Sequence, residues 1–248
     1  MKSAFYSGAS GLSAYQQYMD VIANNLANVG TTGFKPNEVS FENLLSTKMY
    51  VNSAQNPLSG SGVKSVSTGI NASQSSLQPT GYDLDFAIVG DGFFGTRVGD
   101  QFAYTRDGSF SITLVNDVPY LTTQSGAFVV DRTGQPIAIP AATGEAAEAG
   151  SLYDYDALSK SIGVFHFNHA GALQPVSGNG YAETEKSGKP MVMQNETSTI
   201  LRQFLENSGS NMLDQMMNMI SAQRAYQISA RVLQTADENE QTINNLRK

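Results

Sequence analysis

The chain has 248 residues, 40% of them apolar and 15% charged, with 22 acidic against 15 basic side chains and no cysteine. Without cysteine there is no disulfide, no thiolate nucleophile and no Cys-ligated metal centre. The whole net charge of −7 falls between residues 80 and 180, where eleven acidic side chains face four basic ones; this acidic centre argues against nucleic acid as a partner, because phosphate binding needs a basic surface.

The first thirty residues carry a heptad pattern. Two sets of apolar residues recur every seven positions, offset by three: Phe5, Leu12, Met19 and Leu26, and Tyr15, Ile22 and Val29. This spacing predicts a helix over residues 1–30 with a narrow apolar seam that packs against other helices. Its Ser, Gln and Asn flanks make such a helix marginal in water without a partner. They also interrupt any continuous apolar core, so we expect neither a cleaved signal peptide nor membrane insertion.

Glycine and proline end this helix. Gly30 and Gly33 permit the backbone that closes a helix, and Pro36 cannot continue one. Between residues 51 and 82 the only charged side chain is Lys64, among Ser, Gly, Asn, Gln and Thr. This composition predicts an extended connector arm over residues 31–82, with strand character where apolar residues alternate.

Short apolar runs separated by turn residues follow, and each has the length of a strand. They lie at residues 85–89, 93–98, 102–105, 109–114, 119–122, 128–130, 136–139 and 162–167. The residues between them, such as Arg-Asp-Gly and Val-Asn-Asp, are those that tight turns accept. The pattern predicts a compact antiparallel β domain.

A polar connector then leads to a second helical zone that opens at Leu201, is interrupted at residues 207–211, and resumes with Asn211 as N-cap and Asp214 in the first turn. Its apolar stripe has spacings of three, four or seven and contains Met212, Met216, Met219, Tyr226 and Leu233, widened by Leu213, Met217, Ile220, Ile228 and Val232.

Together these elements predict an α+β fold. The N- and C-terminal helices pair antiparallel as a coiled-coil-like rod, with an inserted antiparallel all-β domain and an extended connector. The expected parts are an N-terminal helix (1–30), a connector arm (31–82), a β-rich domain (83–181), a return connector (182–199) and a C-terminal helix (200–248) that completes the helical core domain.

Three patterns suggest chemistry but lack its context. Residues 90–95 match G-x-G-x-x-G, yet no helical period follows, so the glycines are expected to serve turns and not a dinucleotide. His166 and His169 have no third ligand. The pairs Asp83/Asp85 and Asp154/Asp156 are each expected to share a strand face, without a second catalytic group nearby. We therefore expect no catalytic residue, no cofactor and no metal.

Signature segments at both ends and in the centre resemble the bacterial flagellar basal-body rod and hook protein family. They are residues 7–12 (SGASGL), 22–29 (IANNLANV) and 32–35 (TGFK), then 84–88 (LDFAI), 90–94 (GDGFF) and 104–110 (YTRDGSF), then 205–208 (LENS), 222–226 (AQRAY) and 234–238 (QTADE). Within the family, Glu183-Thr184, Ser187-Gly188 and the AQRAY block look most like the distal rod protein, whereas residues 128–137 are also similar to the proximal rod paralogue.

The resemblance implies a structural subunit, exported without a cleaved signal peptide through the flagellar type III apparatus. It would polymerise into a helical tubular drive shaft that crosses the cell envelope in the basal body and transmits torque from motor to hook. Its implied partners are further copies of itself, adjacent rod and hook proteins, the export apparatus, and ring proteins around the rod. The alternative is a surface adhesin or glycan-binding protein with a helical stalk.

The apolar seams and the signature residues on them define the expected subunit interface. It comprises Phe5, Leu12, Tyr15, Met19, Ile22, Asn25, Leu26 and Asn28 in the N-terminal helix, and Met216, Ile220, Arg224, Tyr226 and Leu233 in the C-terminal helix.

Overall fold

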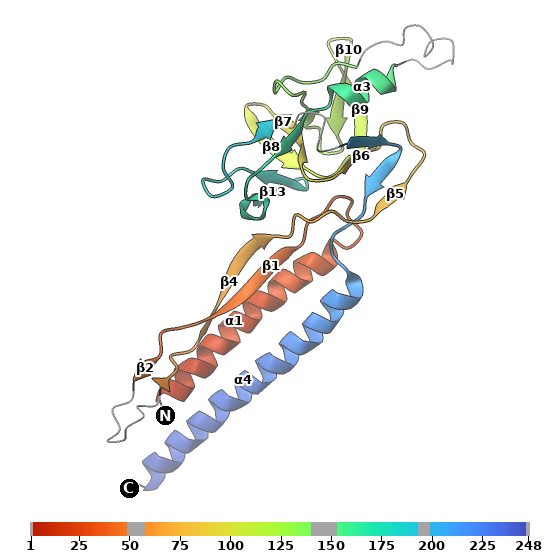
Figure 1. The fold of residues 1–248 in the computed structure, drawn as a ribbon. Coiled ribbons are helices and arrows are strands. Elements are labelled where there is room, and N and C mark those ends of the chain that lie inside the picture. The colour runs from red at the N-terminus through yellow and green to blue at the C-terminus, as the bar shows by residue number, and fades with distance from the viewer. Residues whose placement is uncertain (1, 49–57, 140–152, 193–198, 247–248) are drawn as a thin grey trace. The chain divides into compact units, whose positions relative to one another are not determined.

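The computed structural model describes residues 2–48, 58–139, 153–192 and 199–246 and divides the chain into two compact units. The first, here called the helical unit, consists of Met1–Ala27, Asn37–Thr68 and Asn211–Lys248. The second, the β unit, consists of Asn28–Pro36 and Gly69–Ser210. The chain thus passes between the units more than once, and the expected α+β class with terminal helices and a central antiparallel β domain is confirmed (Figure 1).

The elements follow one another in this order: α1 (Lys2–Ala27), β1 (Asn37–Asn43), β2 (Thr47–Lys48), β3 (Leu58–Ser59), β4 (Val63–Ile70), β5 (Leu77–Pro79), β6 (Phe86–Val89), β7 (Phe93–Val98), β8 (Gln101–Thr105), β9 (Phe110–Val115), β10 (Val118–Thr123), β11 (Phe128–Val129), α3 (Tyr155–Ser161), β12 (Val164–His166), the 3₁₀ turn η1 (Ala170–Ala172), β13 (Gln174–Val176), β14 (Gly180–Ala182), β15 (Met191–Val192), β16 (Thr199–Arg202), β17 (Phe204–Glu206) and α4 (Met212–Leu246).

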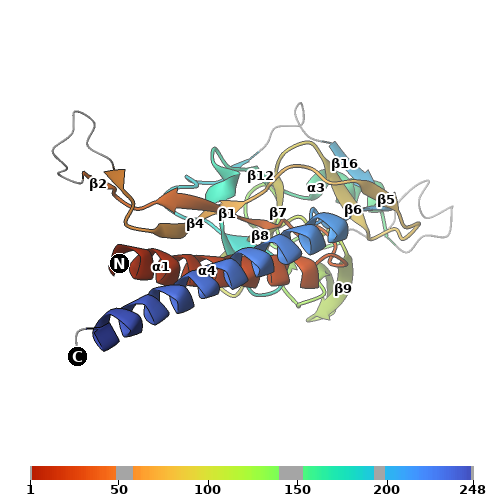
Figure 2. The same ribbon diagram turned by 90° about the horizontal axis from the view of Figure 1, so that it is seen from below.

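In the helical unit, α1 and α4 run side by side and antiparallel, as both ribbon views show (Figures 1 and 2). Small residues bring them close: a Cβ at Gly8 would lie 3.6 Å from the Ser229 carbonyl oxygen and 3.8 Å from Leu233 Cδ1. The Asn211 side chain caps α4 as expected, since its Oδ1 accepts a hydrogen bond from the Leu213 amide at 3.0 Å.

The two-stranded ribbon β1–β4 packs along α1. The rings of Tyr15 and Tyr18 lie 5.3 and 5.4 Å from the ring of Phe41 in β1. Asn25 bonds reciprocally to the backbone of Asn37: its Nδ2 donates to the carbonyl oxygen and its Oδ1 accepts from the amide, both at 2.9 Å. The ribbon therefore covers one side of the α1 seam within the same chain.

The β unit is built on a sheet in the order β13-β14-β8-β7-β11-β10-β9, to which β12 and β15 add through β7. Neighbouring strands of this sheet pair antiparallel, for example with Gly95 opposite Tyr104 and Tyr120 opposite Thr113. Two apolar clusters fill it. The first contains Phe86, Ile88, Phe94, Phe110, Leu121, Val129 and Ile162, and the second Phe93, Tyr104, Val130, Phe165, Phe167 and Tyr181.

Several local expectations were wrong. Residues 136–139, expected as a strand, form isolated bridges at Pro136 and Ala138. The segment from Leu201 to Leu205 opens no helix: β16 pairs with β6 and β17 with β5, and Gln203 between them has φ of 66°, which turns the chain from one partner strand to the next. Asp154 and Asp156 were expected to share a strand face, but residues 155–161 form a helix. Asp154 caps it, with Oδ1 accepting from the Ala157 amide at 3.0 Å.

Candidate functional site

A row of exposed apolar side chains, interrupted by polar residues such as Arg224 and Arg231, runs along α4. Their exposed fractions range from 40% for Met216 to 82% for Leu246, and the row contains Met212, Leu213, Met216, Met217, Ile220, Ile228, Val232, Ile243 and Leu246. Among the described residues of α4 only Ala222 is buried. We call these nine residues the α4 apolar face. Exposed apolar surface of this kind is typical of protein–protein interaction sites.

The opposite side of α4 packs toward α1. Seven of its less exposed residues recur at spacings of four and three along the helix, with Ala225 and Ala230 half-buried beside them: Gln215, Met219, Ala222, Tyr226, Ser229, Leu233 and Ala236. This is the spacing of a helix–helix seam. Tyr226 and Leu233, both expected at the subunit interface, therefore lie on the seam within the chain, whereas Met216, Ile220 and Arg224 are exposed.

The expected interface residues of the N-terminal segment divide in the same way. Ile22 and Asn25 are buried in their own chain, at 1% and 3% exposure. Phe5 is exposed, and the others are half-buried: Leu12, Tyr15, Met19, Leu26 and Asn28. Of the α4 apolar face, the predicted interface set held only Met216 and Ile220. The signal for Leu213, Met217, Ile228 and Val232 was the width of the stripe, since a helix with one partner needs a narrower one.

The β unit holds a second notable site, a buried cluster of three charges around Glu206, which we call the Glu206 junction. Glu206 Oε1 accepts from Lys35 Nζ at 2.7 Å and from the Ser75 amide at 2.7 Å, and Oε2 accepts from Arg106 Nη1 at 3.0 Å. The three side chains are at most 1% exposed. Each of the three residues lies in a signature segment, at residues 32–35, 104–110 and 205–208, but nothing in the sequence indicated that they meet, because the segments lie far apart in the chain.

Burial sets the electrostatics of the junction. It lowers the pKa of Lys35 below the usual lysine value, and the attraction of the Glu206 carboxylate offsets part of that effect. Lys35 Nζ also donates to the Ser73 carbonyl oxygen at 2.6 Å. On the adjoining sheet, burial raises the pKa of Tyr181, whose hydroxyl accepts from the Lys35 amide at 3.0 Å.

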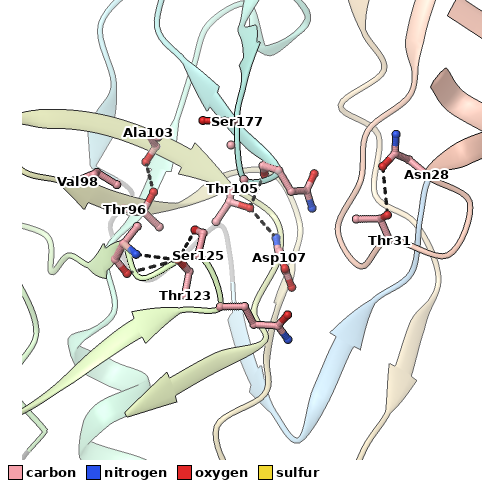
Figure 3. A pocket seen from close by; sticks show the side chains of 15 residues that line it. Asn28, Thr31, Thr96, Val98, Ala103, Thr105, Asp107, Thr123, Ser125 and Ser177 are labelled. Atoms are coloured by element: carbon pink, nitrogen blue, oxygen red, sulfur yellow. Dashed lines mark hydrogen bonds between the residues drawn. The ribbon is translucent and has the colours of Figure 1, made fainter. Parts of the chain in front are cut away.

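A pocket of about 370 Å³ opens on the sheet of the β unit (Figure 3). Its polar groups bond mainly to one another: Thr96 Oγ1 donates to the Ala103 carbonyl oxygen at 2.9 Å, and Thr105 Oγ1 accepts from the Asp107 amide at 3.0 Å. No aromatic ring is among its lining residues. The pocket therefore lacks the aromatic groove expected of a glycan-binding module.

Two of the aspartates considered for catalysis lie in a turn and in a β-bridge. Asp83 lies in a turn, where its Oδ1 accepts from Gln203 Nε2 at 2.8 Å, while Asp85 lies in an isolated bridge to Ser109, so the expected shared strand face was wrong. The described parts of the chain contain no group of three or more His, Cys, Asp or Glu side chains able to hold a metal ion. The side chain of Asp156 lies outside the described residues.

The G-x-G-x-x-G segment forms a turn and the start of β7. Gly90 and Gly92 have φ of 100° and 129°, which favour glycine. A side chain at Gly95 would collide with the Phe165 ring. The expectation that these glycines serve turns is confirmed for Gly90 and Gly92, whereas Gly95 lies within β7, where it leaves room for the Phe165 ring. None of the helices within the described ranges has the length and apolar character to cross a membrane.

Three family models match the chain in consecutive segments. Residues 5–35 match the model described as flagella basal body rod protein, residues 87–159 match the flagellar hook protein FlgE/F/G D1 domain, and residues 201–246 match the flagellar basal body rod FlgEFG protein C-terminal. The matches cover α1, much of the β unit and α4, in the order in which the signature segments occur.

Curated relatives match over the full length. The flagellar basal-body rod protein FlgG of Bacillus subtilis is 33% identical over 267 residues, covering 100% of both chains. The FlgG of Buchnera aphidicola subsp. Baizongia pistaciae is 34% identical, with 96% of this chain and 97% of the relative covered. The flagellar basal-body rod protein FlgF of Mesorhizobium japonicum is 31% identical, with 99% and 98% covered.

Proposed function

Because the chain belongs to the flagellar basal-body rod protein family, we propose that it assembles with further copies of itself into the rod through the α4 apolar face. It is a structural rod subunit and not an enzyme. The observation that carries the proposal is the exposure of nine large apolar side chains on one helix whose opposite side already has an intramolecular partner.

Assembly would bury apolar side chains of α4 that the single chain leaves exposed. Each exposed apolar side chain that another subunit covers contributes on the order of 1.5–3 kcal/mol. A face that is not self-complementary joins copies head to tail, and a rotation that does not close yields a helical filament. We propose that α1 and α4 form a coiled-coil-like pair in the inner part of such a filament, and that the filament is a tubular drive shaft carrying torque through packed side chains.

Membership of the family supports a proposal for the position in the rod and for the remaining partners. The FlgG names of the Bacillus and Buchnera relatives favour the distal rod. We propose that adjacent rod and hook proteins, the type III export apparatus and ring proteins around the rod are its partners. Its location is then the basal body, reached without a cleaved signal peptide.

Leu26→Asp tests in cells the part of this proposal that places the pair of α1 and α4 in the inner part of the filament. Leu26 is half-buried on α1, and a charge there should abolish rod assembly and motility but leave the β unit folded, because the β unit has its own core. Swimming in soft agar, electron microscopy of basal bodies and circular dichroism of the purified chain measure the three properties. Leu26→Met is the matched control and should swim. Normal rods built from Leu26→Asp would contradict this placement of the helix pair.

A further inference from the structure

The Glu206 junction fastens three separate segments of the chain. The first is residues 28–36, the second residues 69–76 and the third residues 206–210. Backbone hydrogen bonds join them directly: the Asn71 amide donates to Pro36 O at 2.9 Å, the Gly209 amide to Phe34 O at 2.8 Å, and the Asn207 amide to Ser76 O at 2.9 Å. All of these groups belong to the β unit.

These segments are the ones that lead to the helical unit. The chain leaves or enters the β unit after residues 27, 36, 68 and 210, and every one of these points adjoins a fastened segment. When these segments are ordered, each stretch of chain that leads to the helical unit starts from a fixed position in the β unit.

Glu206 connects the three segments to one another and to the sheet. Its carboxylate bonds to Lys35 in the first segment and to the Ser75 amide in the second, and its own carbonyl oxygen accepts from the Gly33 amide at 2.8 Å. Arg106 supplies the tie to the sheet: Nη2 donates to Gly90 O at 2.7 Å, and the guanidinium lies 5.5 Å from the centroid of the Phe93 ring in the second apolar cluster.

The arrangement depends on the charge of Glu206. Lys35 and Arg106 are both buried cations, and the Glu206 carboxylate bonds to each of them. Removing one partner of a buried ion pair leaves an uncompensated buried charge, which costs far more than the pair contributes. Gly33 adds a steric condition, because its φ of 64° and its contact with the backbone of Arg106 leave no room for a side chain.

We propose that Glu206 is an ionic clasp. Residues 33–36, 73–76 and 206–210 are ordered together while the Glu206 carboxylate bonds to Lys35 and Arg106, and they lose their order together when it does not. The sheet of the β unit stays folded in both cases. The first segment keeps a separate tie to the sheet at Thr32, whose Oγ1 donates to Asp107 Oδ1 at 2.8 Å and whose carbonyl oxygen accepts from Asn179 Nδ2 at 2.7 Å. The clasp therefore governs the segment from Gly33 onward and not its first residues.

Amide hydrogen exchange of the full monomeric chain, followed by NMR, tests the clasp apart from rod assembly. In Glu206→Gln the amides of Gly33, Ser75, Asn207 and Gly209 should exchange on the order of a hundredfold faster than in the wild type. The sheet amides of Leu121 and Val130, which donate to Ile137 O and Gly95 O, should keep their rates. Equal acceleration of sheet and clasp amides, or no acceleration of either, would overturn the proposal.

A double variant separates charge from packing. Lys35→Met removes one of the two cations, so in the Glu206→Gln background it should slow exchange of the clasp amides relative to Glu206→Gln alone. A clasp that acted only through packing would give faster exchange in the double variant. If Glu206→Gln fails to fold, the double variant should still fold; failure of the double variant beside a folded Lys35→Met single variant would refute the clasp.

Asp131→Asn, a carboxylate-to-amide change at a remote turn, is the control and should accelerate only the amides bonded to that turn.

Discussion

The two units of this chain differ in how far they bury their apolar side chains. In the β unit, Phe94 and Leu121 are fully buried in a cluster supplied by strands and by α3. In the helical unit, Leu213 and Ile228 are 71% and 62% exposed on a helix in which Ala222 alone is buried among the described residues. The β unit has a core of its own, whereas the helical unit keeps a large part of its apolar surface uncovered.

The difference explains how one polypeptide serves as an assembly subunit. A long helix with one partner and an exposed apolar face is marginally stable, since most helical stability in proteins comes from packing. In the assembly proposed above, a second subunit covers the face and supplies the missing contacts. Stability of the β unit should therefore be independent of protein concentration, and order in α4 should depend on it.

The largest expected effect comes from placing charge on the α4 apolar face. Met217→Asp combined with Ile220→Asp should abolish assembly, because two carboxylates would have to be buried between subunits. Both side chains are exposed in the single chain, so the unfolding free energy of the monomer should change by less than about 1 kcal/mol. Sedimentation of the purified chain measures assembly, and thermal denaturation measures stability.

Leu114→Asp is the matched control for that variant. Leu114 is 68% exposed at the end of β9 in the β unit, so it tests whether any exposed leucine matters equally. The control should assemble like the wild type. Loss of assembly in Leu114→Asp, or its retention in the α4 variant, would remove the distinction between the two units.

Truncating a side chain in the core of the β unit should instead lower the stability of the monomer. Phe94→Ala removes a fully buried ring that contacts Phe110 at a centroid distance of 5.2 Å. The expected loss is about 3–5 kcal/mol of unfolding free energy in the monomer, measured by urea denaturation monitored by near-UV circular dichroism. The matched exposed change, Phe102→Ala at 45% exposure, should cost much less. Similar losses for the two would show that the β unit lacks the core described here.

A smaller, local effect is expected in the helical unit at Asn25. Asn25→Ala removes both hydrogen bonds to the Asn37 backbone and leaves a half-buried amide and carbonyl without their partner. The expected cost is about 1–3 kcal/mol, seen as faster amide exchange at the start of β1. Gln16→Ala, at an exposed position of the same helix, should leave β1 unchanged; equal exchange in the two variants would contradict the tie.

The smallest effect at neutral pH belongs to Tyr104. Burial, aided by the Glu183 carboxylate, raises the pKa of Tyr104 to about 12 from 10.0. The unfolded chain then loses this proton first, so the contribution of Tyr104 to stability is complete below pH 10 and is lost as the pH rises toward 12. Denaturation curves between pH 9 and 12 should show a shallower decline for Tyr104→Phe than for the wild type. An unchanged slope would contradict the assigned burial.

Local signals in the sequence were enough for the elements with local causes. The Asn211 cap, the turn residues between β6 and β10, and the heptads of α1 each act within a few residues, and the structure bears them out. The reversal at Gln203 was missed because a non-glycine residue at positive φ gives no compositional signal. The extended form of residues 199–206 depends on β6 and β5, more than a hundred residues earlier in the chain.

The site was predictable to the same extent. The heptad positions located the helices that carry it, but they did not distinguish a seam filled by the same chain from a face left for another. Ile22 and Asn25 lie on the predicted seam and are covered by their own chain. The Glu206 junction was unpredictable from spacing, because Lys35 and Glu206 are separated by 171 residues and become neighbours only through the tertiary fold.

Hydrogen exchange measured by mass spectrometry, on dilute monomer and on assembled rods, tests the central claim most directly. We expect peptides from α4 to exchange rapidly in the monomer and slowly in the rod, while peptides from β7 and β10 are protected equally in both. Peptides from α1 and α4 that are already as protected as those of β7 in dilute monomer, with no change on assembly, would contradict the claim that the helical unit completes its packing only with a second subunit.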